Sequence, residues 1–394
     1  MDKKTIKDLK LDNKKVLIRV DYNVSLNSRF KIADDTRIKQ TIPTLLYLLK
    51  KNCALILIAH LGRPEGKINR KLSLKPLAKY LEKILNRKVD FCSDYLSKEG
   101  REKIKKIKPG QIILLENLRF HKEEKANDAK FAKKLAGLAE VFVNDGFGVS
   151  HRRHASTTGV TMFLPSVAGL LLEKEIDIFS KVLKKPKHPF VSIIGGAKTE
   201  TKIKLINKLL EKSDFVILGG CIANTFLKAR GYNVGKSKID KQAVKTAKHL
   251  IWKAARMKTS LMMPTDAVLG TLETGYVNGV EPTESINPKL QMLDIGPRSE
   301  AEFGNLIANA GTIIWNGPMG VAEKKEFSHG TTFIYYAIAQ NKKAFSIVGG
   351  GETLACLPKK EYLQAISHLS TGGGAMLEFI EKGTLPGIEA LQDK

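Results

Sequence analysis

Cysteine is scarce and scattered in this chain. The 394 residues contain only Cys53, Cys92, Cys221 and Cys356. No two of them form a C-x-x-C pair, and no histidine stands at ligand spacing from them. The sequence therefore predicts neither a structural zinc site nor a disulfide framework. Such cysteine usage is typical of a reducing cytosol.

Long hydrophobic runs are also missing. The first ten residues, MDKKTIKDLK, carry charges with no apolar stretch behind them, which excludes an ordinary secretory signal. The longest nearly uncharged stretch, residues 157–172, contains Pro165 and is shorter than the roughly 18–20 apolar residues of a membrane span. We therefore expect a soluble cytoplasmic protein with no membrane partner.

Acidic residues are few compared with basic ones. The chain has 40 Asp and Glu against 66 Lys and Arg, a formal net charge of +26, and the imbalance is largest in residues 1–170. A lysine-rich solvated surface explains such a charge, and an anionic ligand drawn to the first half is the functional alternative. A specific nucleic-acid partner is disfavoured, because no basic run alternates with aromatic residues.

Short runs rich in valine, isoleucine and leucine recur along the chain. Each is followed by a longer stretch with helical periodicity, an alternation typical of parallel α/β units. Together with the length, it predicts an α/β protein with two doubly wound, Rossmann-like parallel-sheet domains. The predicted strands are Lys15–Asp21, Ala54–His60, Ile112–Glu116, Val141–Asp145, Phe190–Ile194, Phe215–Leu218, Leu261–Met263, Thr312–Trp315 and Phe345–Val348.

One helix is predicted between the two halves. Residues Val167–Leu183 have helical periodicity, and Pro186 follows, where a helix stops because proline lacks the required N–H group. We take residues 171–186 as a linker helix between a first domain, residues 1–170, and a second domain, residues 187–381. The tail, residues 382–394, is expected to pack back on the first domain.

The predicted strand ends differ in chemistry between the halves. In doubly wound sheets, ligands bind beyond the carboxyl ends of the strands. In the first half these ends read RVDYN, AHLGR, ENLRF and NDGFGVSHRRH; in the second they read IIGGAK, ILGG, IIWNGPMG and SIVGGGET. Cationic ends suit a small polyanion, whereas glycine lets backbone N–H groups approach a nucleotide phosphate. We therefore expect one ligand in each domain.

Several basic side chains fall at or just after the predicted strand ends of the first half. A guanidinium group matches a carboxylate or phosphate with two donors. Each such arginine alone is better explained as a surface ion-pair partner, but their common placement at one sheet edge favours an anion site for the set. His151 is interpreted as a further anion contact and His154 as an ordinary polar residue. The basic set comprises Arg37, His60, Arg63, Arg119, Arg152 and Arg153.

Glycine and lysine point to a phosphate site in the second half. The triplets Gly349–Gly351 and Gly372–Gly374 precede predicted helix starts, whose N–H groups lack partners. A triplet alone also occurs in tight turns. Lys198 and Lys202, four apart at a predicted helix start, would share one face and attract an anion there, with solvated surface lysines as the alternative. The segment GYNVGKS at 231–237 lacks the spacing of a phosphate-binding P-loop and is rejected as one.

Eleven motifs, in order along nearly the whole chain, together resemble the phosphoglycerate kinase family. They are RVDYNV (19–24), DDTRI (34–38), HLGRP (60–64), ENLRF (116–120), NDGFGVSHRRHAS (144–156), GGAKTETKI (195–203), GGCIANTF (219–226), LDIGP (293–297), WNGPMG (315–320), GGGET (349–353) and STGGGA (370–375). The resemblance implies reversible transfer of the acyl phosphate of 1,3-bisphosphoglycerate to ADP, giving ATP and 3-phosphoglycerate. It also implies a monomer that closes about a hinge.

The resemblance implies specific residue roles. Three groups would stabilise the phosphoryl group during transfer: Arg37, Lys198 and the N–H groups around Gly373 and Gly374. Phosphoglycerate would be bound by Asp21, Asn23, Arg37, His60, Leu61, Gly62, Arg63, Arg119, His151 and Arg152. The nucleotide would be bound by Gly196, Lys198, Lys202, Gly219, Glu323, Gly349, Gly350, Gly351, Glu352 and Thr353, with Glu323 on the ribose.

Magnesium is the implied cofactor, bound with ADP or ATP. Glu352 would serve the metal, and it stands where the family usually has aspartate. The alternative to this whole interpretation is a basic nucleic-acid-binding or scaffolding protein that kept the fold and lost the activity. Candidates at every catalytic position argue against that alternative.

Overall fold

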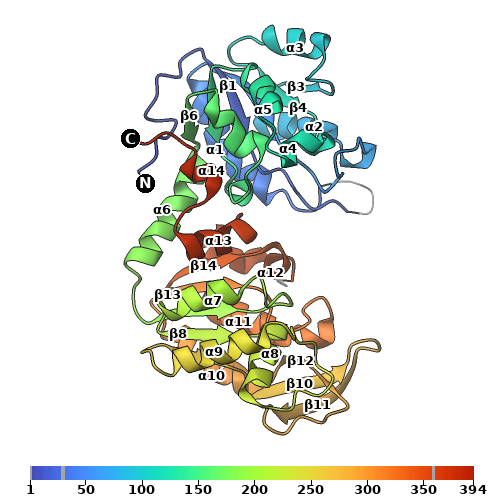
Figure 1. Ribbon diagram of the computed structural model, residues 1–394, viewed down its shortest axis with the longest axis vertical. Helices are drawn as coiled ribbons and strands as arrows, with labels where there is room; N and C mark the ends of the chain where they lie inside the picture. The colour runs from blue at the N-terminus through green and yellow to red at the C-terminus, as the bar shows by residue number, and fades with distance from the viewer. Residues whose placement is uncertain (1, 28–31, 357–359) are drawn as a thin grey trace. The chain divides into compact units, whose positions relative to one another are not determined.

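The computed structural model describes residues 2–27, 32–356 and 360–394. The chain divides into two compact units (Figure 1). Unit 1 comprises Met1–Ser180 and Lys382–Lys394, and unit 2 comprises Lys181–Glu381. Each unit contains a parallel six-stranded sheet, which confirms the predicted α/β class with two parallel-sheet domains.

The sheet of unit 1 has the strand order β3, β4, β2, β1, β5, β6. Its strands are β1 (Lys15–Arg19), β2 (Ala54–Ile58), β3 (Val89–Cys92), β4 (Ile112–Leu115), β5 (Val141–Asn144) and β6 (Ser166–Ala168). The helices are α1 (Thr36–Lys50), α2 (Lys75–Leu85), α3 (Lys98–Lys105), α4 (Lys122–Lys125), α5 (Ala129–Ala136) and α14 (Pro386–Glu389). Helix α6 (Leu170–Lys184) contains the boundary between the units.

Both faces of this sheet are buried, which explains why its strands read as continuous apolar runs. Leu55 and Leu57 pack in one core with Leu45 of α1 and Leu81 of α2. Ile56, which points to the opposite face, is also fully buried. Because both faces are covered, only the strand ends are left to carry polar chemistry.

The sheet of unit 2 has the order β15, β14, β13, β7, β8, β9. Its strands are β7 (Phe190–Ile194), β8 (Phe215–Leu218), β9 (Ser260–Met262), β13 (Thr312–Asn316), β14 (Phe345–Gly349) and β15 (His368–Ser370). The helices are α7 (Ile203–Leu210), α8 (Gly220–Arg230), α9 (Val244–Ala254), α10 (Pro297–Ala308), α11 (His329–Gln340), α12 (Gly351–Ala355) and α13 (Gly374–Lys382).

Unit 2 also contains an antiparallel sheet that we did not predict. It consists of β10 (Asp266–Thr271), β11 (Tyr276–Pro282) and β12 (Gln291–Ile295) in the order β11, β10, β12. Strand β11 is largely exposed, so it lacks the apolar run that marks the other strands. The short strands β3, β6 and β15 were missed for a related reason, because their sequences, VDFC, SVA and HLS, are not continuous apolar runs.

Two predictions about helix starts are wrong. Residues 166–168 form β6 alongside β5, so the helix predicted from Val167 begins at Leu170 instead. Asp145 accepts hydrogen bonds from the N–H groups of Leu171 and Leu172 at 2.9 and 3.3 Å, which holds the first turn of α6 at this position.

The second error concerns Lys198 and Lys202. Helix α7 begins only at Ile203, so Lys198 lies in the preceding turn and Lys202 is the residue before the helix. The two lysines do not share a helix face.

The C-terminal tail packs in unit 1 beside the end of β5. Gly387 N–H donates to the carbonyl of Ser150 at 2.8 Å, and the Asn144 side chain donates to the carbonyl of Gly387 at 3.0 Å. The chain's two ends also meet, because Lys4 N–H donates to Gln392 O at 2.8 Å. Within the described residues, no helix is long and apolar enough to cross a membrane.

Candidate active site

Strands β4, β2, β1 and β5 are neighbours in the unit 1 sheet, and all run parallel. Their carboxyl ends therefore bring the polar segments after them to one edge. Gly62 N–H donates to the side-chain oxygen of Asn23 at 2.8 Å, and Arg119 Nη1 donates to the carbonyl of Gly62 at 2.8 Å. The Asn117 side chain donates to the carbonyl of Leu61 at 2.8 Å. The structure thus assembles segments separated by up to a hundred residues.

Arg37 reaches this edge from α1. Its Nη1 donates to the Asp21 carboxylate at 2.7 Å and to the carbonyl of Asn23 at 3.3 Å. The Asp21 side chain is 6% exposed, whereas that of Arg37 is 28% exposed. Asp21 therefore holds the arginine, and part of the guanidinium group remains accessible to a ligand.

The basic side chains at this edge raise one another's electrostatic energy. Burial, with the charges of Arg152 and Arg19, lowers the pKa of Arg119 to about 10. The pKa of Arg152 is lowered by burial and by the charges of Arg63 and Arg37. Cations that repel in this way are relieved by an anion between them. The arginines at this edge therefore lie close enough to act on one another, unlike isolated surface charges.

Two buried side-chain nitrogens at this edge have no hydrogen-bond partner within the described residues. One is Arg119 Nε and the other is His60 Nε2. Arg119 is 8% exposed and His60 is 1% exposed. Buried donors without partners are rare in folded proteins because each is costly. A bound ligand is one way in which such groups gain partners.

His151 and Arg152 lie beside each other after β5. Arg152 Nε donates to His151 Nε2 at 3.1 Å, and both side chains are half-buried. Arg63 and Arg153 are exposed. His154 lies 3.7 Å from the Glu124 carboxylate, so its contact is with a buried acid of the protein.

Beneath this edge lies a polar network that sequence reasoning missed. Arg19, 1% exposed, donates from Nε to Ser156 Oγ at 2.9 Å and reaches His60 Nδ1 with Nη2 at 3.1 Å. Ser156 in turn donates to the fully buried Glu124 at 2.6 Å. The sequence did mark Arg19, because this charged residue directly follows the apolar run at residues 16–18 in the predicted strand. Nothing in the segment KEEK distinguishes Glu124 from an exposed acidic residue.

In unit 2 the strand ends are tied together by backbone hydrogen bonds. Gly196 N–H donates to the carbonyl of Pro318 at 2.8 Å, and Gly220 N–H to that of Met319 at 2.7 Å. Buried Lys202 donates from Nζ to the carbonyl of Gly195 at 2.7 Å. The lysine therefore lies at the end of β7, among the glycine segments, although it does not lie on a helix face with Lys198.

Not every glycine here leaves room for a ligand. An added Cβ would lie 2.0 Å from the carbonyl oxygen of Pro318 at Gly195, 2.6 Å from Met319 Cε at Gly219 and 2.2 Å from Met376 Sδ at Gly349. These three are therefore explained by packing within the protein. At Gly351 and Gly373, by contrast, a Cβ would meet nothing within 4 Å. Gly373 has a φ of 48°, a backbone conformation that itself favours glycine, so Gly351 is the position where neither packing nor backbone conformation explains the glycine.

The remaining predicted nucleotide contacts differ in their surroundings. Gly350 has a φ of 107° and precedes α12, whose first residue is Gly351. Thr353 is buried, and its hydroxyl accepts a hydrogen bond from Gly317 N–H at 2.7 Å, so that hydroxyl serves the fold. Lys198 and Glu323 are exposed. The side chain of Glu352 lies outside the described part of the structure.

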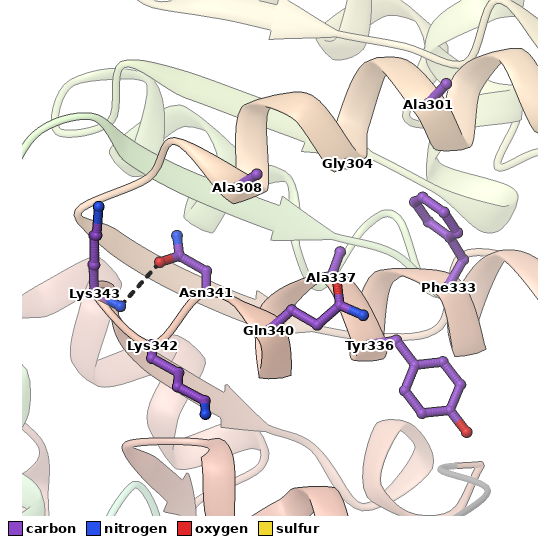
Figure 2. A pocket seen from close by; sticks show the side chains of 10 residues that line it. All are labelled: Ala301, Gly304, Ala308, Phe333, Tyr336, Ala337, Gln340, Asn341, Lys342 and Lys343. Carbon is purple, nitrogen blue, oxygen red and sulfur yellow. Dashed lines mark hydrogen bonds between the residues drawn. The ribbon is translucent and has the colours of Figure 1, made fainter.

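A separate groove lies away from these strand ends, on unit 2 (Figure 2). It runs between α10 and α11, with Ala301 and Gly304 on one side and Phe333 and Tyr336 on the other. None of the predicted site residues lines it. Its lining is mainly apolar and small residues, so we take the polar strand ends, and not this groove, as the candidate active site.

Known proteins with the same organisation are found by sequence and by structure. The family model described as "Phosphoglycerate kinase" matches residues 6–383. Two proteins named phosphoglycerate kinase, from Moorella thermoacetica and Koribacter versatilis, are 46% and 45% identical over 100% of both chains. A solved phosphoglycerate kinase from Coxiella burnetii has a TM-score of 0.86 at 40% identity, covering 98% of each chain. One from Pyrococcus horikoshii has a TM-score of 0.84 at 31% identity with the same coverage.

Proposed function

The chain belongs to the phosphoglycerate kinase family, and from this premise we propose that unit 1 binds phosphoglycerate and unit 2 binds the nucleotide. Its activity is phosphoryl transfer to and from 3-phosphoglycerate, a step of glycolysis. The finer assignments below rest on the geometry of each unit.

One observation carries the assignment of unit 1. His60 Nε2 and Arg119 Nε are buried donors without partners within the described residues, and they lie among mutually repelling arginines. A triose with a carboxylate at one end and a phosphate at the other supplies acceptors and negative charge together. In this proposal Asp21 and Asn23 orient Arg37 and the Gly62 loop. The full set is Asp21, Asn23, Arg37, His60, Leu61, Gly62, Arg63, Arg119, His151 and Arg152.

We assign the nucleotide to the glycine-lined strand ends of unit 2. Its phosphates would approach the backbone at Gly350 and Gly351, where α12 begins, and at Gly351 a side chain would occupy the ligand's place. Lys202 lies at the same edge. Exposed Glu323 would accept hydrogen bonds from the ribose hydroxyls. Gly196, Gly219, Gly349 and Thr353 would shape this surface, chiefly through their packing.

The chemistry itself requires positioning and charge neutralisation rather than a nucleophilic side chain. Both substrates are anions, so the protein must first overcome their repulsion. Arg37, Lys198 and the N–H groups around Gly373 and Gly374 would bind the oxygens of the phosphoryl group as it passes in line from donor to acceptor. These groups act most strongly where charge spreads in the transition state.

Magnesium fits the donor set of unit 2 only if the nucleotide supplies most of its ligands. Within the described residues, no three His, Cys, Asp or Glu side chains cluster as a metal site. Magnesium in phosphoryl-transfer enzymes is commonly held by one or two carboxylates plus phosphate oxygens and waters. Glu352, the second residue of α12, is the carboxylate that follows the glycine triplet. Bound there, the ion would neutralise phosphate charge.

Three substitutions at Glu352 test its metal role. Glu352→Asp is expected to keep most activity, Glu352→Gln to raise the magnesium concentration needed for half-maximal rate, and Glu352→Ala to lose turnover while binding metal-free ADP normally. The reason is that only the first keeps a carboxylate near the phosphates. Wild-type magnesium dependence in all three variants would mean that Glu352 merely favours the helix N-terminus.

Gly351→Ala is expected to raise the KM for ATP on the order of tenfold, because the new methyl group would occupy space that the phosphates need. The melting temperature should not fall, since the added Cβ would meet nothing within 4 Å of the protein. Gly137→Ala, in unit 1, is the matched control; its Cβ would make only an ordinary 3.5 Å contact. An unchanged KM for ATP would remove Gly351 from the site.

In-line transfer also requires the two ligands to meet, so we propose that binding both substrates draws the units together about α6. Small-angle scattering should show a smaller radius of gyration with 3-phosphoglycerate and nucleotide present than with either alone. Equal radii at saturation would refute closure.

The activity itself is tested by a coupled assay. Purified protein should consume NADH when 3-phosphoglycerate, ATP and magnesium are supplied with glyceraldehyde-3-phosphate dehydrogenase. No turnover, together with tight and salt-resistant binding of one RNA or DNA, would instead favour a nucleic-acid scaffold. We place the enzyme in the cytoplasm as a monomer, which cell fractionation and light scattering would check.

A further inference from the structure

The protonation state of His60 is fixed by a single neighbour. Arg19 Nη2 lies 3.1 Å from His60 Nδ1. A guanidinium group donates hydrogen bonds and accepts none, so Nδ1 must be the acceptor and carries no proton. An imidazolium ring, or a neutral ring protonated at Nδ1, would place two N–H donors face to face. The form that remains is the neutral ring with its proton on Nε2.

Arg19 is itself rigidly held. It is 1% exposed, and all three of its side-chain nitrogens are engaged. Nη1 donates to the carbonyl of Val20 at 2.5 Å, Nε donates to Ser156 Oγ at 2.9 Å, and Nη2 donates to His60. The arginine therefore cannot turn away from the histidine without breaking two other bonds in a buried site.

The buried charge of Arg19 is balanced through Ser156. The Ser156 hydroxyl donates to Glu124 at 2.6 Å, and its backbone N–H donates to the other carboxylate oxygen at 3.0 Å. Burial alone would raise the pKa of Glu124, but hydrogen bonds from His154 and Ser156 and the charge of Arg19 outweigh it and lower that pKa. Glu124 is thus the anion that makes a buried Arg19 tolerable.

The opposite ring nitrogen of His60 belongs to the anion site. His60 Nε2 is buried and has no hydrogen-bond partner within the described residues. We propose that Glu124, Ser156 and Arg19 form a buried relay that locks His60 in its Nε2–H tautomer and so presents a neutral donor to the anionic substrate. In this relay Arg19 is a positioning residue. The substrate's identity rests on the proposed function, whereas the tautomer does not.

A neutral donor suits this crowded edge. The groups facing His60 are Arg19 from β1, Arg119 after β4, and Arg152 and His154 after β5. With burial as the largest cause, these cations lower the pKa of His60 well below 6.5. A further positive charge here would repel them. The Nε2–H group instead gives one directed hydrogen bond that does not change across the physiological pH range.

The tautomer is read directly by NMR. In protein labelled with 15N-histidine, with His60 assigned by comparison with His60→Gln, Nε2 should carry the proton and Nδ1 should not, from about pH 6 to about pH 8. This measurement needs neither substrate nor activity. A protonated Nδ1 in the wild-type protein, or a ring that titrates near its ordinary pKa, overturns the proposal.

A double variant tests the relay. Arg19→Gln with Glu124→Gln removes both buried charges together, so neither is left unpaired. We expect mixed tautomers at His60 and a KM for 3-phosphoglycerate raised on the order of tenfold. The KM for ATP and kcat should change less than about twofold. The rise in KM should shrink as the pH falls and His60 becomes charged, whereas a merely structural defect would not follow the His60 titration.

The matched control is a second charge-neutral pair in unit 1. Lys14→Gln with Glu140→Gln removes an exposed ion pair of 2.6 Å and should leave His60 and both KM values unchanged. If the relay variant keeps the wild-type tautomer and KM, the relay does not act as proposed. If wild-type protein shows the expected tautomer but no turnover, the proposed function fails and the tautomer lock stands.

Discussion

Replacing Arg37 by alanine is expected to lower kcat by roughly 10³-fold or more, because an arginine on a transferring phosphoryl group contributes a factor of that order. Arg37 is the site arginine that α1 supplies, and Asp21 holds its Nη1 at 2.7 Å while the side chain remains 28% exposed. The group is thus oriented before substrate arrives. Nucleotide affinity, measured by calorimetry, should stay near the wild-type value since unit 2 is untouched.

The control for Arg37 is another arginine of unit 1 whose side chain is exposed. Arg87 lies after α2, and Arg87→Ala should retain wild-type kcat. If Arg37→Ala also turns over at a near-normal rate, Arg37 is only a partner for Asp21. A raised KM for 3-phosphoglycerate with unchanged kcat would place it in ground-state binding instead.

Replacing Glu124 by alanine is expected to lower the free energy of unfolding of unit 1 by about 3–5 kcal/mol, because it leaves the Arg19 charge buried without its balancing anion. Glu124 is fully buried, and both carboxylate oxygens accept hydrogen bonds from Ser156. Differential scanning calorimetry should show the transition of unit 1 moving to lower temperature. The transition of unit 2 provides an internal reference in the same experiment.

The contribution of Glu124 also has a defined pH dependence. Its pKa in the folded protein lies below the ordinary value of 4.5, so folding favours the ionised carboxylate. This stability is present above about pH 4.5 and is lost as the pH falls through the folded-state pKa. Glu123→Ala, at the neighbouring, less buried position, should change stability by no more than about 0.5 kcal/mol. Equal losses in the two variants would contradict a role for the buried charge.

The sequence predicted most of the fold because the central strands are buried on both faces. Phe190–Ile194 and Phe215–Leu218 were predicted with their observed bounds, since each is an apolar run ended by charged or glycine residues. Strand β11 escaped because its residues are mostly exposed and its pattern is that of a loop. The start of α6 was misplaced because the three residues of β6 are as compatible with a helix as with a strand until β5 is beside them.

The candidate site also has features that the sequence predicts and features that it does not. Arg119 and His60 were predicted to lie at one edge because strand ends in a parallel sheet converge, a rule that needs only strand positions. The glycines were found as a group, but sequence could not separate Gly195, which the carbonyl of Pro318 crowds, from Gly351, which nothing crowds. That distinction depends on contacts between segments more than a hundred residues apart. Glu124 was missed because its partner Ser156 is 32 residues away and nothing near Glu124 in the sequence marks it as buried.

Unit 1 is formed by two separate parts of the chain, so it cannot be complete until both have been synthesised. Its first 180 residues emerge from the ribosome long before residues 382–394, which complete the same unit. Until then Asn144 and Ser150 lack the hydrogen bonds that Gly387 supplies, and Lys4 lacks the carbonyl of Gln392. Unit 2 is contiguous in sequence and can close as soon as it has been synthesised. Residues 382–394 therefore complete the unit that was begun first, and unit 1 finishes folding only after unit 2 has been synthesised.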